Sequence, residues 1–125
     1  MSGRRILVVD DNLLNVELVR FILESAGFEL SIVNDATQAV DHIRAQSPDL
    51  ILMDIQLPGI DGLELTRRLK ADPETCGITV VAFTAYAMKG DETKMRAAGC
   101  DGYLSKPINV ATFADQVRGY LQAVG

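Results

Sequence analysis

The sequence contains no tryptophan, a single histidine and only two cysteines. No apolar run approaches the roughly 20 residues that a membrane-spanning helix needs, so no membrane span is expected. The two thiols, Cys76 and Cys100, share neither a metal-binding nor a redox spacing. Isolated thiols of this kind suit a reducing compartment, and we expect both to be inert.

Basic residues are in the minority, with 12 lysines and arginines against 17 acidic residues and a formal net charge of −5. Phosphate binding needs a basic face, so nucleic acid is not expected as a direct partner. The rest of the composition, 48% hydrophobic and 23% charged, is that of an ordinary globular protein. The first residues, 1–5, contain no signal-peptide cleavage site, which predicts a cytoplasmic protein.

Linkers, repeats and low-complexity tracts are absent as well. A length of 125 residues suits one domain and is sufficient to bury most of its apolar surface. We therefore expect residues 1–125 to form a single domain, without a second domain attached.

Five short segments have the composition of β-strands. Two of them, Ile6–Val9 and Leu50–Met53, are uninterrupted apolar runs, the pattern of strands buried on both faces of a parallel sheet. Phe28–Val33 is less uniformly apolar, which favours a position nearer an edge. Ile78–Phe83 and Tyr103–Leu104 are the other two predicted strands.

Helical segments alternate with these strands, and most of them have capping residues at their starts and glycine or proline at their ends. The predicted helices run from Asn12 to about Ala26, from Asp35 to Ser47-Pro48, from Asp61 to Asp72-Pro73, over Tyr86–Ala98, and from Asn109 onwards. Five strands alternating with five helices predict an α/β fold, a single doubly wound five-stranded parallel sheet covered on both faces.

The apolar positions of each helix predict the face that it buries. The residues expected to face the core are Leu14, Leu18, Phe21 and Ile22 in the first helix, Ala36, Ala39, Val40 and Ile43 in the second, Leu65 and Leu69 in the third, and Val110, Phe113, Val117, Leu121 and Val124 in the last. The segment Tyr86–Ala98 has a thin apolar stripe and contains Gly90, so it is the helix whose local opening sacrifices the fewest contacts.

Polar residues follow the strands at the edge where parallel sheets bind ligands. Asp10 and Asp11 follow the first strand, Asp54 the third, Thr84 the fourth and Lys106 the fifth. Three carboxylates brought together repel one another unless a cation joins them, and Mg²⁺ prefers such oxygen ligands. Three carboxylates, one divalent cation and one lysine sum to zero charge.

These groups suit phosphoryl transfer to a carboxylate. A carboxylate held beside Mg²⁺ and a lysine can attack phosphorus and carry an acyl phosphate, while Lys106 supplies a point charge and Thr84 a hydroxyl donor for the phosphoryl oxygens. Such a reaction depends on positioning and charge neutralisation more than on a general base.

The whole chain resembles the response-regulator receiver domains of two-component signalling, and among them the stand-alone DivK type. The matching segments are Val8-Val9-Asp10-Asp11-Asn12, Leu52-Met53-Asp54, Leu57-Pro58-Gly59-Ile60-Asp61-Gly62, Phe83-Thr84-Ala85 and Ser105-Lys106-Pro107, in the family's order and with its approximate spacing. The DivK-like segments are Asp54-Ile55-Gln56-Leu57-Pro58 and residues 85–92. The resemblance implies a CheY-like, flavodoxin-like sheet with the strand order 2-1-3-4-5.

The resemblance also implies a role for each residue at this edge. Asp54 would be the phospho-acceptor, and Asp11, Asp54 and the backbone carbonyl of Gln56 would ligate Mg²⁺ or Mn²⁺. Asp10 would act on the metal through water. Lys106, before a cis peptide bond to Pro107, would hold the phosphoryl group.

Four positions are implied to switch the protein or tune it. Thr84 would swing toward the phosphoryl group, and Tyr103 would fill the space that it vacates. Gln56 and Tyr86 would control how readily water reaches the acyl phosphate. A ring at Tyr86 shields that bond, which predicts a long-lived phosphoryl state.

The implied partners are proteins. A histidine kinase or a histidine phosphotransfer protein would donate the phosphoryl group, because the only histidine of the chain, His42, is predicted to be a surface residue. A downstream protein would read the face formed by the fourth helix, the fifth strand and the fifth helix. The chain would be a switch that assists its own phosphorylation and dephosphorylation rather than a turnover enzyme. A weak homodimer is a further possible assembly.

Two other classes fit the sequence less well. A haloacid-dehalogenase-type phosphatase needs a second aspartate two residues after the nucleophile, where this chain has Gln56. A flavodoxin-like FMN carrier needs a hydroxyl-rich phosphate loop after the first strand, where Asp10 and Asp11 would repel the ligand. Turnover of a small phosphoester would support the phosphatase class, and a yellow purified protein would support the flavodoxin class. No P-loop pattern is present.

Overall fold

A computed structural model of the chain describes residues 4–54, 62–84, 89–105 and 109–124. In order, the elements are β1 (Arg5–Val9), α1 (Leu13–Ser25), β2 (Glu29–Val33), α2 (Ala36–Ala45), β3 (Leu50–Met53), α3 (Gly62–Ala71), β4 (Thr79–Thr84), α4 (Lys89–Ala98), β5 (Gly102–Ser105) and α5 (Phe113–Val124). The predicted Asp61 cap and the residues 86–88 of the fourth predicted helix lie outside the described residues.

The five strands form one sheet in the order β2-β1-β3-β4-β5, and every neighbouring pair is parallel. This confirms the predicted doubly wound fold and its strand order. The two uninterrupted apolar strands, β1 and β3, are neighbours in the interior of the sheet, and β2 lies at one edge. Their positions follow from burial, because interior strands of a covered sheet meet apolar surroundings on both faces.

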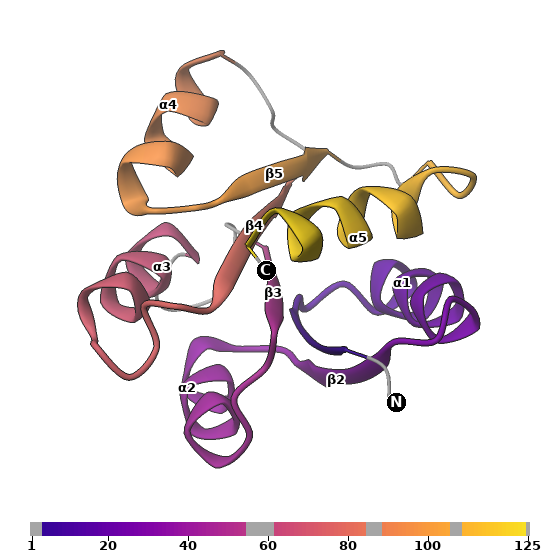
Figure 1. Cartoon of the computed structure of the whole chain (residues 1–125), viewed down its shortest axis with the longest axis horizontal. Coiled ribbons are helices and arrows are strands. Elements are labelled where there is room, and N and C mark those ends of the chain that lie inside the picture. Colours follow the sequence, from indigo (N-terminus) through magenta and orange to yellow (C-terminus); the bar gives the residue numbers. More distant parts are fainter. Residues whose placement is uncertain (1–3, 55–61, 85–88, 106–108, 125) are drawn as a thin grey trace.

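The helices divide between the two faces of the sheet, with α1 and α5 on one face and α2, α3 and α4 on the other (Figure 1). Side chains alternate along each strand, so Leu7 and Val9 pack toward α2 and α3 while Ile6 and Val8 pack toward α1 and α5. The molecule thus has two apolar cores, one on each side of a single sheet.

The predicted inward face of α1 is wrong for three of its four residues. Leu14, Leu18 and Phe21 are exposed, with Leu14 83% and Phe21 70% accessible, and of the predicted set Ile22 alone is buried. The helix instead buries Val16, Val19, Ile22 and Leu23. Both sets repeat at helical spacing, so periodicity could not choose between them.

The last helix also begins later than predicted. Asn109 caps a turn, accepting the Ala111 N–H with its side chain and the Thr112 and Phe113 N–H groups with its backbone carbonyl. Helix α5 starts only at Phe113, which leaves Val110 60% exposed instead of inward. Phe113, Val117 and Leu121 are buried as predicted, and the side chain of Val124 is outside the described residues.

An ion pair that the sequence did not predict connects α3 with the starts of β4 and β5. Lys70 Nζ lies 2.9 Å from Asp101 Oδ2 and donates to the Ile78 carbonyl at 2.7 Å. The same Asp101 oxygen accepts the Val80 N–H at 2.8 Å. Gly99, at φ +102°, lies against the Lys70 stem, where a Cβ would come within 2.8 Å of Lys70 Cγ. The end of α3 is therefore attached to the starts of both β4 and β5.

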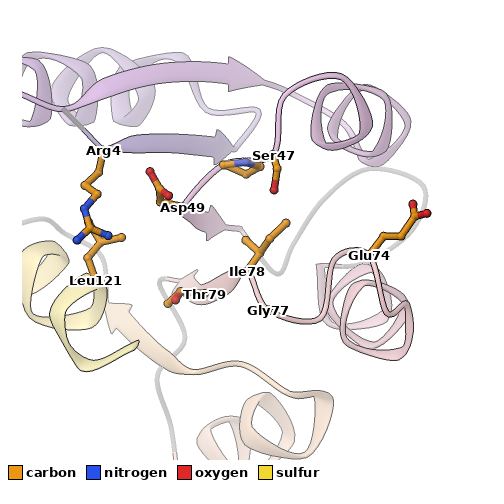
Figure 2. A pocket seen from close by; sticks show the side chains of 9 residues that line it. Arg4, Ser47, Asp49, Glu74, Gly77, Ile78, Thr79 and Leu121 are labelled. Carbon is orange, nitrogen blue, oxygen red and sulfur yellow. The ribbon is translucent and has the colours of Figure 1, made fainter. Parts of the chain in front are cut away.

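A cavity of about 300 Å³ lies at the amino ends of the strands (Figure 2). Arg4, Asp49 and Thr79 line it from the starts of β1, β3 and β4, with Leu121 of α5 beside Arg4. The Thr79 hydroxyl is buried there and has no hydrogen-bond partner among the described residues. This edge is opposite to the one that the sequence predicts to be functional.

The variant Thr79→Val is expected to raise the free energy of unfolding by about 1 kcal/mol, because it removes a buried hydroxyl without a partner. Urea unfolding followed by circular dichroism measures the difference. Thr75→Val is the matched control, since the Thr75 hydroxyl donates to the Leu69 carbonyl at 2.6 Å, and its loss should destabilise. A decrease in stability for Thr79→Val would show that its hydroxyl is hydrogen-bonded in solution.

The two free cysteines differ in their environments. Cys76 is exposed, whereas Cys100 is buried, and burial raises the pKa of the Cys100 thiol while the hydrogen bond with Thr66 opposes this. We expect Cys76 to react with a disulfide reagent at least about tenfold faster than Cys100 at neutral pH, because the thiolate is the reactive form. Cys76→Ser should leave the slow phase only, and a fast phase in that variant would contradict the prediction.

Candidate phosphoryl-acceptor and metal site

The carboxyl ends of β1 and β3 place two aspartates side by side. The last register pair is Val9 with Met53, so the next residues, Asp10 and Asp54, are neighbours. Backbone hydrogen bonds continue past the strand ends, from Asp54 N–H to the Val9 carbonyl at 2.9 Å and from Asp10 N–H to the Val33 carbonyl at 3.1 Å. The sheet therefore positions both residues before any side chain takes part.

A third carboxylate joins them from the start of the next segment. Asp10, Asp11 and Asp54 each have a carboxylate oxygen within 4.8 Å of the others. Asp10 and Asp54 are only 2% and 6% exposed, whereas Asp11 is exposed. The site thus opens to solvent on the Asp11 side and is enclosed by the sheet below.

Asn12 orients Asp10 of the carboxylate cluster. The sequence predicted Asn12 only as the N-cap of the first helix. Its backbone N–H donates to Asp10 Oδ1 at 2.9 Å, and its side chain accepts the Asn15 N–H as the N-cap of α1. Aspartates commonly form a turn in which the side chain accepts the N–H of the residue two positions later. The triplet Asp10-Asp11-Asn12 was therefore a signal from which this hydrogen bond could have been predicted. The start of α1 is consequently joined to Asp10 of the carboxylate cluster.

The donor set fits a hard divalent cation. Clustered anions that are largely buried are costly without a positive charge, and carboxylate oxygens are what Mg²⁺ and Mn²⁺ prefer. Separations of up to 4.8 Å leave space for one hydrated cation to contact all three carboxylates directly or through water. The structure confirms that Asp10, Asp11 and Asp54 converge.

Other predicted site residues are described only in part. Thr84 is the final residue of β4 and pairs with Ser105, the final residue of β5, so its backbone reaches the same edge of the sheet; its side chain is not described. Lys106 follows Ser105 directly but lies outside the described residues, as do Gln56, Tyr86 and the Lys106-Pro107 bond. Their roles stay predictions.

Tyr103 lies on the edge strand β5, half-buried and packed against the core on the α2, α3 and α4 side. Its backbone carbonyl accepts a hydrogen bond from the Tyr120 hydroxyl of α5 at 3.2 Å. The Tyr120 ring lies over Gly102, where a Cβ would overlap it. Strand β5 and helix α5 are therefore joined at the residue that the sequence predicts to switch.

The fold and this acidic edge define a class of signalling domain. A family model of the response regulator receiver domain matches residues 6–118. The chain therefore belongs to the response regulator receiver domain family, whose members act in two-component systems with histidine kinases and downstream targets.

Among curated proteins, the chain is 47% identical over 118 residues to the polar-differentiation response regulator DivK of Brucella anthropi, covering 94% of this chain and 96% of that protein. Among solved structures, a putative response regulator from Chloroflexus aurantiacus superposes with a TM-score of 0.92 at 28% identity, covering 97% and 99% of the two chains. The resemblance to DivK-type receivers is thus confirmed.

A third relative bears on the metal. The receiver domain of the sensor histidine kinase PA1611 from Pseudomonas aeruginosa has a magnesium ion coordinated in its active-site cleft; it is 34% identical, with a TM-score of 0.87 and coverage of 97% and 99%. Receiver-domain relatives thus bind a divalent cation, and the carboxylate cluster of this chain is an acidic site of the kind that the cation needs.

None of the described helices is long and apolar enough to cross a membrane.

Proposed function

We propose that Asp54 accepts a phosphoryl group from a phosphohistidine on a partner histidine kinase or histidine phosphotransfer protein. The observation that carries this proposal is the convergence of Asp10, Asp11 and Asp54 within 4.8 Å at the carboxyl edge of the sheet. Of the three, Asp54 follows the central strand, between the Asp10-Asp11 pair of β1 and the ends of β4 and β5. It would therefore be the carboxylate at the centre of the other predicted groups.

In the reaction, a carboxylate oxygen of Asp54 attacks phosphorus as the bond between phosphorus and the imidazole nitrogen breaks. The imidazole leaves with the electron pair and takes up a proton, and an acyl phosphate remains on Asp54. The chain needs no general base, since a carboxylate that attacks phosphorus has no proton to lose in the step. Its contribution is to hold Asp54 rigidly, through the Val9 hydrogen bond, and to neutralise charge.

Asp11, Asp54 and the Gln56 carbonyl would hold Mg²⁺, with Asp10 acting through water. When bound, the cation supplies positive charge for the phosphoryl oxygens. Asp10 is fixed by the Asn12 N–H and is the more deeply buried, which favours the indirect role, while exposed Asp11 can turn toward the ion. Lys106 would hold another phosphoryl oxygen.

Phosphorylation would then change the face formed by α4, β5 and α5. Thr84 would move to donate to the phosphoryl group, and Tyr103 would turn into the vacated space. The hydrogen bond from Tyr120 to the Tyr103 carbonyl connects this movement with α5. A downstream protein in the cytoplasm would read the result, and the chain would act as a switch, with no turnover of a small substrate.

Two residues would set the lifetime of the acyl phosphate. Gln56 and Tyr86, each two positions beyond Asp54 and Thr84, would control the approach of water. The Tyr86 ring would shield the phosphoryl group, so Tyr86→Ala should shorten its lifetime, and an unchanged lifetime would count against shielding.

The direct test is transfer from a phosphorylated histidine phosphotransfer domain, with phosphoramidate as a small donor that contains the same nitrogen–phosphorus bond. We expect intact mass spectrometry to show the gain of one phosphoryl group in the presence of Mg²⁺ and none with a chelator. Borohydride reduces an aspartyl phosphate to homoserine with loss of phosphate, and peptide mapping should place this conversion at position 54. Label on another residue, or a label that is independent of the metal, would overturn the proposal.

A metal-binding variant tests the cluster apart from phosphorylation. Asp11→Asn is expected to weaken Mg²⁺ binding at least about tenfold, because it replaces an anionic ligand by a neutral one. Isothermal titration calorimetry with Mg²⁺ measures the affinity directly. Asp115→Asn, which removes an exposed carboxylate next to Arg118, is the control and should bind as the native chain does. Equal affinities for both variants would remove Asp11 from the ligand set.

A further inference from the structure

A second concave surface lies between α2 and α3, on the face of the sheet away from α1 and α5. Val40 and Ile43 form one wall and Leu65 and Leu69 the other. Its volume is about 200 Å³, below the roughly 300–1,000 Å³ of typical small-molecule sites. A cavity of this size suits a single large apolar side chain, the kind of anchor that concentrates binding energy at protein interfaces.

Two arginines flank the mouth of this cavity. Arg44 of α2 and Arg68 of α3 both line it and both are exposed. Arg68 has Glu64 as a partner at 3.5 Å, but this pair is largely solvated and holds the guanidinium weakly. The one acid in the lining, Asp72, already accepts the Glu74 N–H with one oxygen. The lining thus has two arginines against one aspartate, in a chain whose net charge is −5.

We propose that this α2–α3 cavity docks a partner protein through an acidic segment with one large apolar anchor residue. The anchor would enter between Val40 and Leu69, and carboxylates on either side of it would meet Arg44 and Arg68. Ile43, Leu65 and Leu69 are buried core residues and Val40 is half-buried against them, so the cavity is formed before the partner arrives, which lowers the cost of binding. Each guanidinium group can donate two hydrogen bonds to a carboxylate.

The proposal goes beyond phosphorylation, because none of the lining residues belongs to the carboxylate cluster. It adds a recognition surface that works whether or not Asp54 is phosphorylated. The affinity for this segment is therefore expected to stay the same when phosphoramidate and Mg²⁺ are added.

A designed peptide tests the proposal directly. The probe is a fluorescein-labelled peptide with one phenylalanine between two pairs of glutamates in a glycine-serine frame, titrated into the full chain by fluorescence anisotropy. Arg44→Glu and Arg68→Glu should each weaken binding at least about fivefold. Arg67→Glu makes the same charge change one residue away on α3, outside the lining, and should leave the affinity within about twofold.

Methyl NMR locates the peptide independently of the variants. The methyl signals of Val40, Ile43, Leu65 and Leu69 should shift on addition of the probe, and a peptide with lysine in place of glutamate should leave them unchanged. Equal weakening by Arg67→Glu, shifts confined to other methyls, a loss of binding on addition of phosphoramidate and Mg²⁺, or no binding at about 1 mM peptide would overturn the proposal. Sedimentation showing that the native chain self-associates through this cavity, with loss in Arg44→Glu, would assign it to a second copy and overturn it equally.

Discussion

The Asp54→Asn variant is expected to lose phosphoryl transfer from a phosphohistidine donor by at least about a hundredfold, because the amide is not a nucleophile for phosphorus. The loss should affect the chemical step itself. Rapid-mixing measurement of label per chain over time, at saturating Mg²⁺, gives the rate constant. The fold should persist, since asparagine has nearly the same shape and removes one of the charges that Asp10 and Asp54 bring together at the edge of the sheet.

Asp41→Asn provides the comparison for Asp54→Asn. Asp41 is an exposed carboxylate on α2 outside the cluster, so its replacement changes the net charge equally without touching the site. Native rates in Asp41→Asn together with a collapsed rate in Asp54→Asn would assign the acceptor. A labelled Asp54→Asn chain with native kinetics would require a different acceptor and would refute the proposed chemistry.

The Gly102→Ala variant is expected to lower the free energy of unfolding by about 1–3 kcal/mol. A Cβ at Gly102 would lie 2.7 Å from the Tyr120 hydroxyl oxygen and would overlap the ring itself. The ring must move away, and its hydrogen bond to the Tyr103 carbonyl is lost. Urea unfolding monitored by circular dichroism measures the cost.

A double-mutant cycle separates this explanation from a general intolerance of alanine in β5. Tyr120→Ala removes the ring, so Gly102→Ala should cost less than about 0.5 kcal/mol in that background, a strongly non-additive result. Additive costs would show that the strain at Gly102 lies elsewhere. The same pair is informative for signalling, since the contact connects Tyr103 with α5.

Much of the site was predictable because it depends on strand ends. Asp10, Asp11 and Asp54 each follow an apolar run, and parallel strands bring their carboxyl ends to one edge whatever the helices do. The described carboxylates meet as the sequence predicted. Thr84 reaches the same edge through its backbone, for the same reason.

The predictions failed where two faces of a helix carry apolar residues. In α1, Val19 and Leu23 enter the core and Leu14 and Phe21 do not, a choice made by the shape of the sheet and of α5 beneath the helix. At α5, the turn at Asn109 satisfies its own backbone groups and delays the helix to Phe113. The first choice depends on tertiary packing and the second on the hydrogen bonds of a turn, so neither is readable from periodicity.

The contacts between distant segments could not be predicted from the sequence, because they too depend on how the elements pack in the folded protein. Lys70 and Asp101 are 31 residues apart, and nothing in their neighbourhoods marks them as partners. The approach of Tyr120 to Gly102 similarly depends on how α5 lies across the sheet. The α2–α3 cavity is what remains between two helices whose packing leaves a gap at Val40 and Leu69.

The order of apolar runs and acids along the chain by itself determined the parallel sheet and the gathering of carboxylates at one edge. Strands that alternate with helices run parallel, and residues that follow parallel strands meet at the same edge of the sheet. Tertiary structure alone decided which face of α1 is buried, how α5 holds β5, and where an arginine-rimmed cavity opens. Those outcomes depend on the packing of surfaces that meet only in the folded protein, where shape and burial select among patterns that the sequence leaves equivalent.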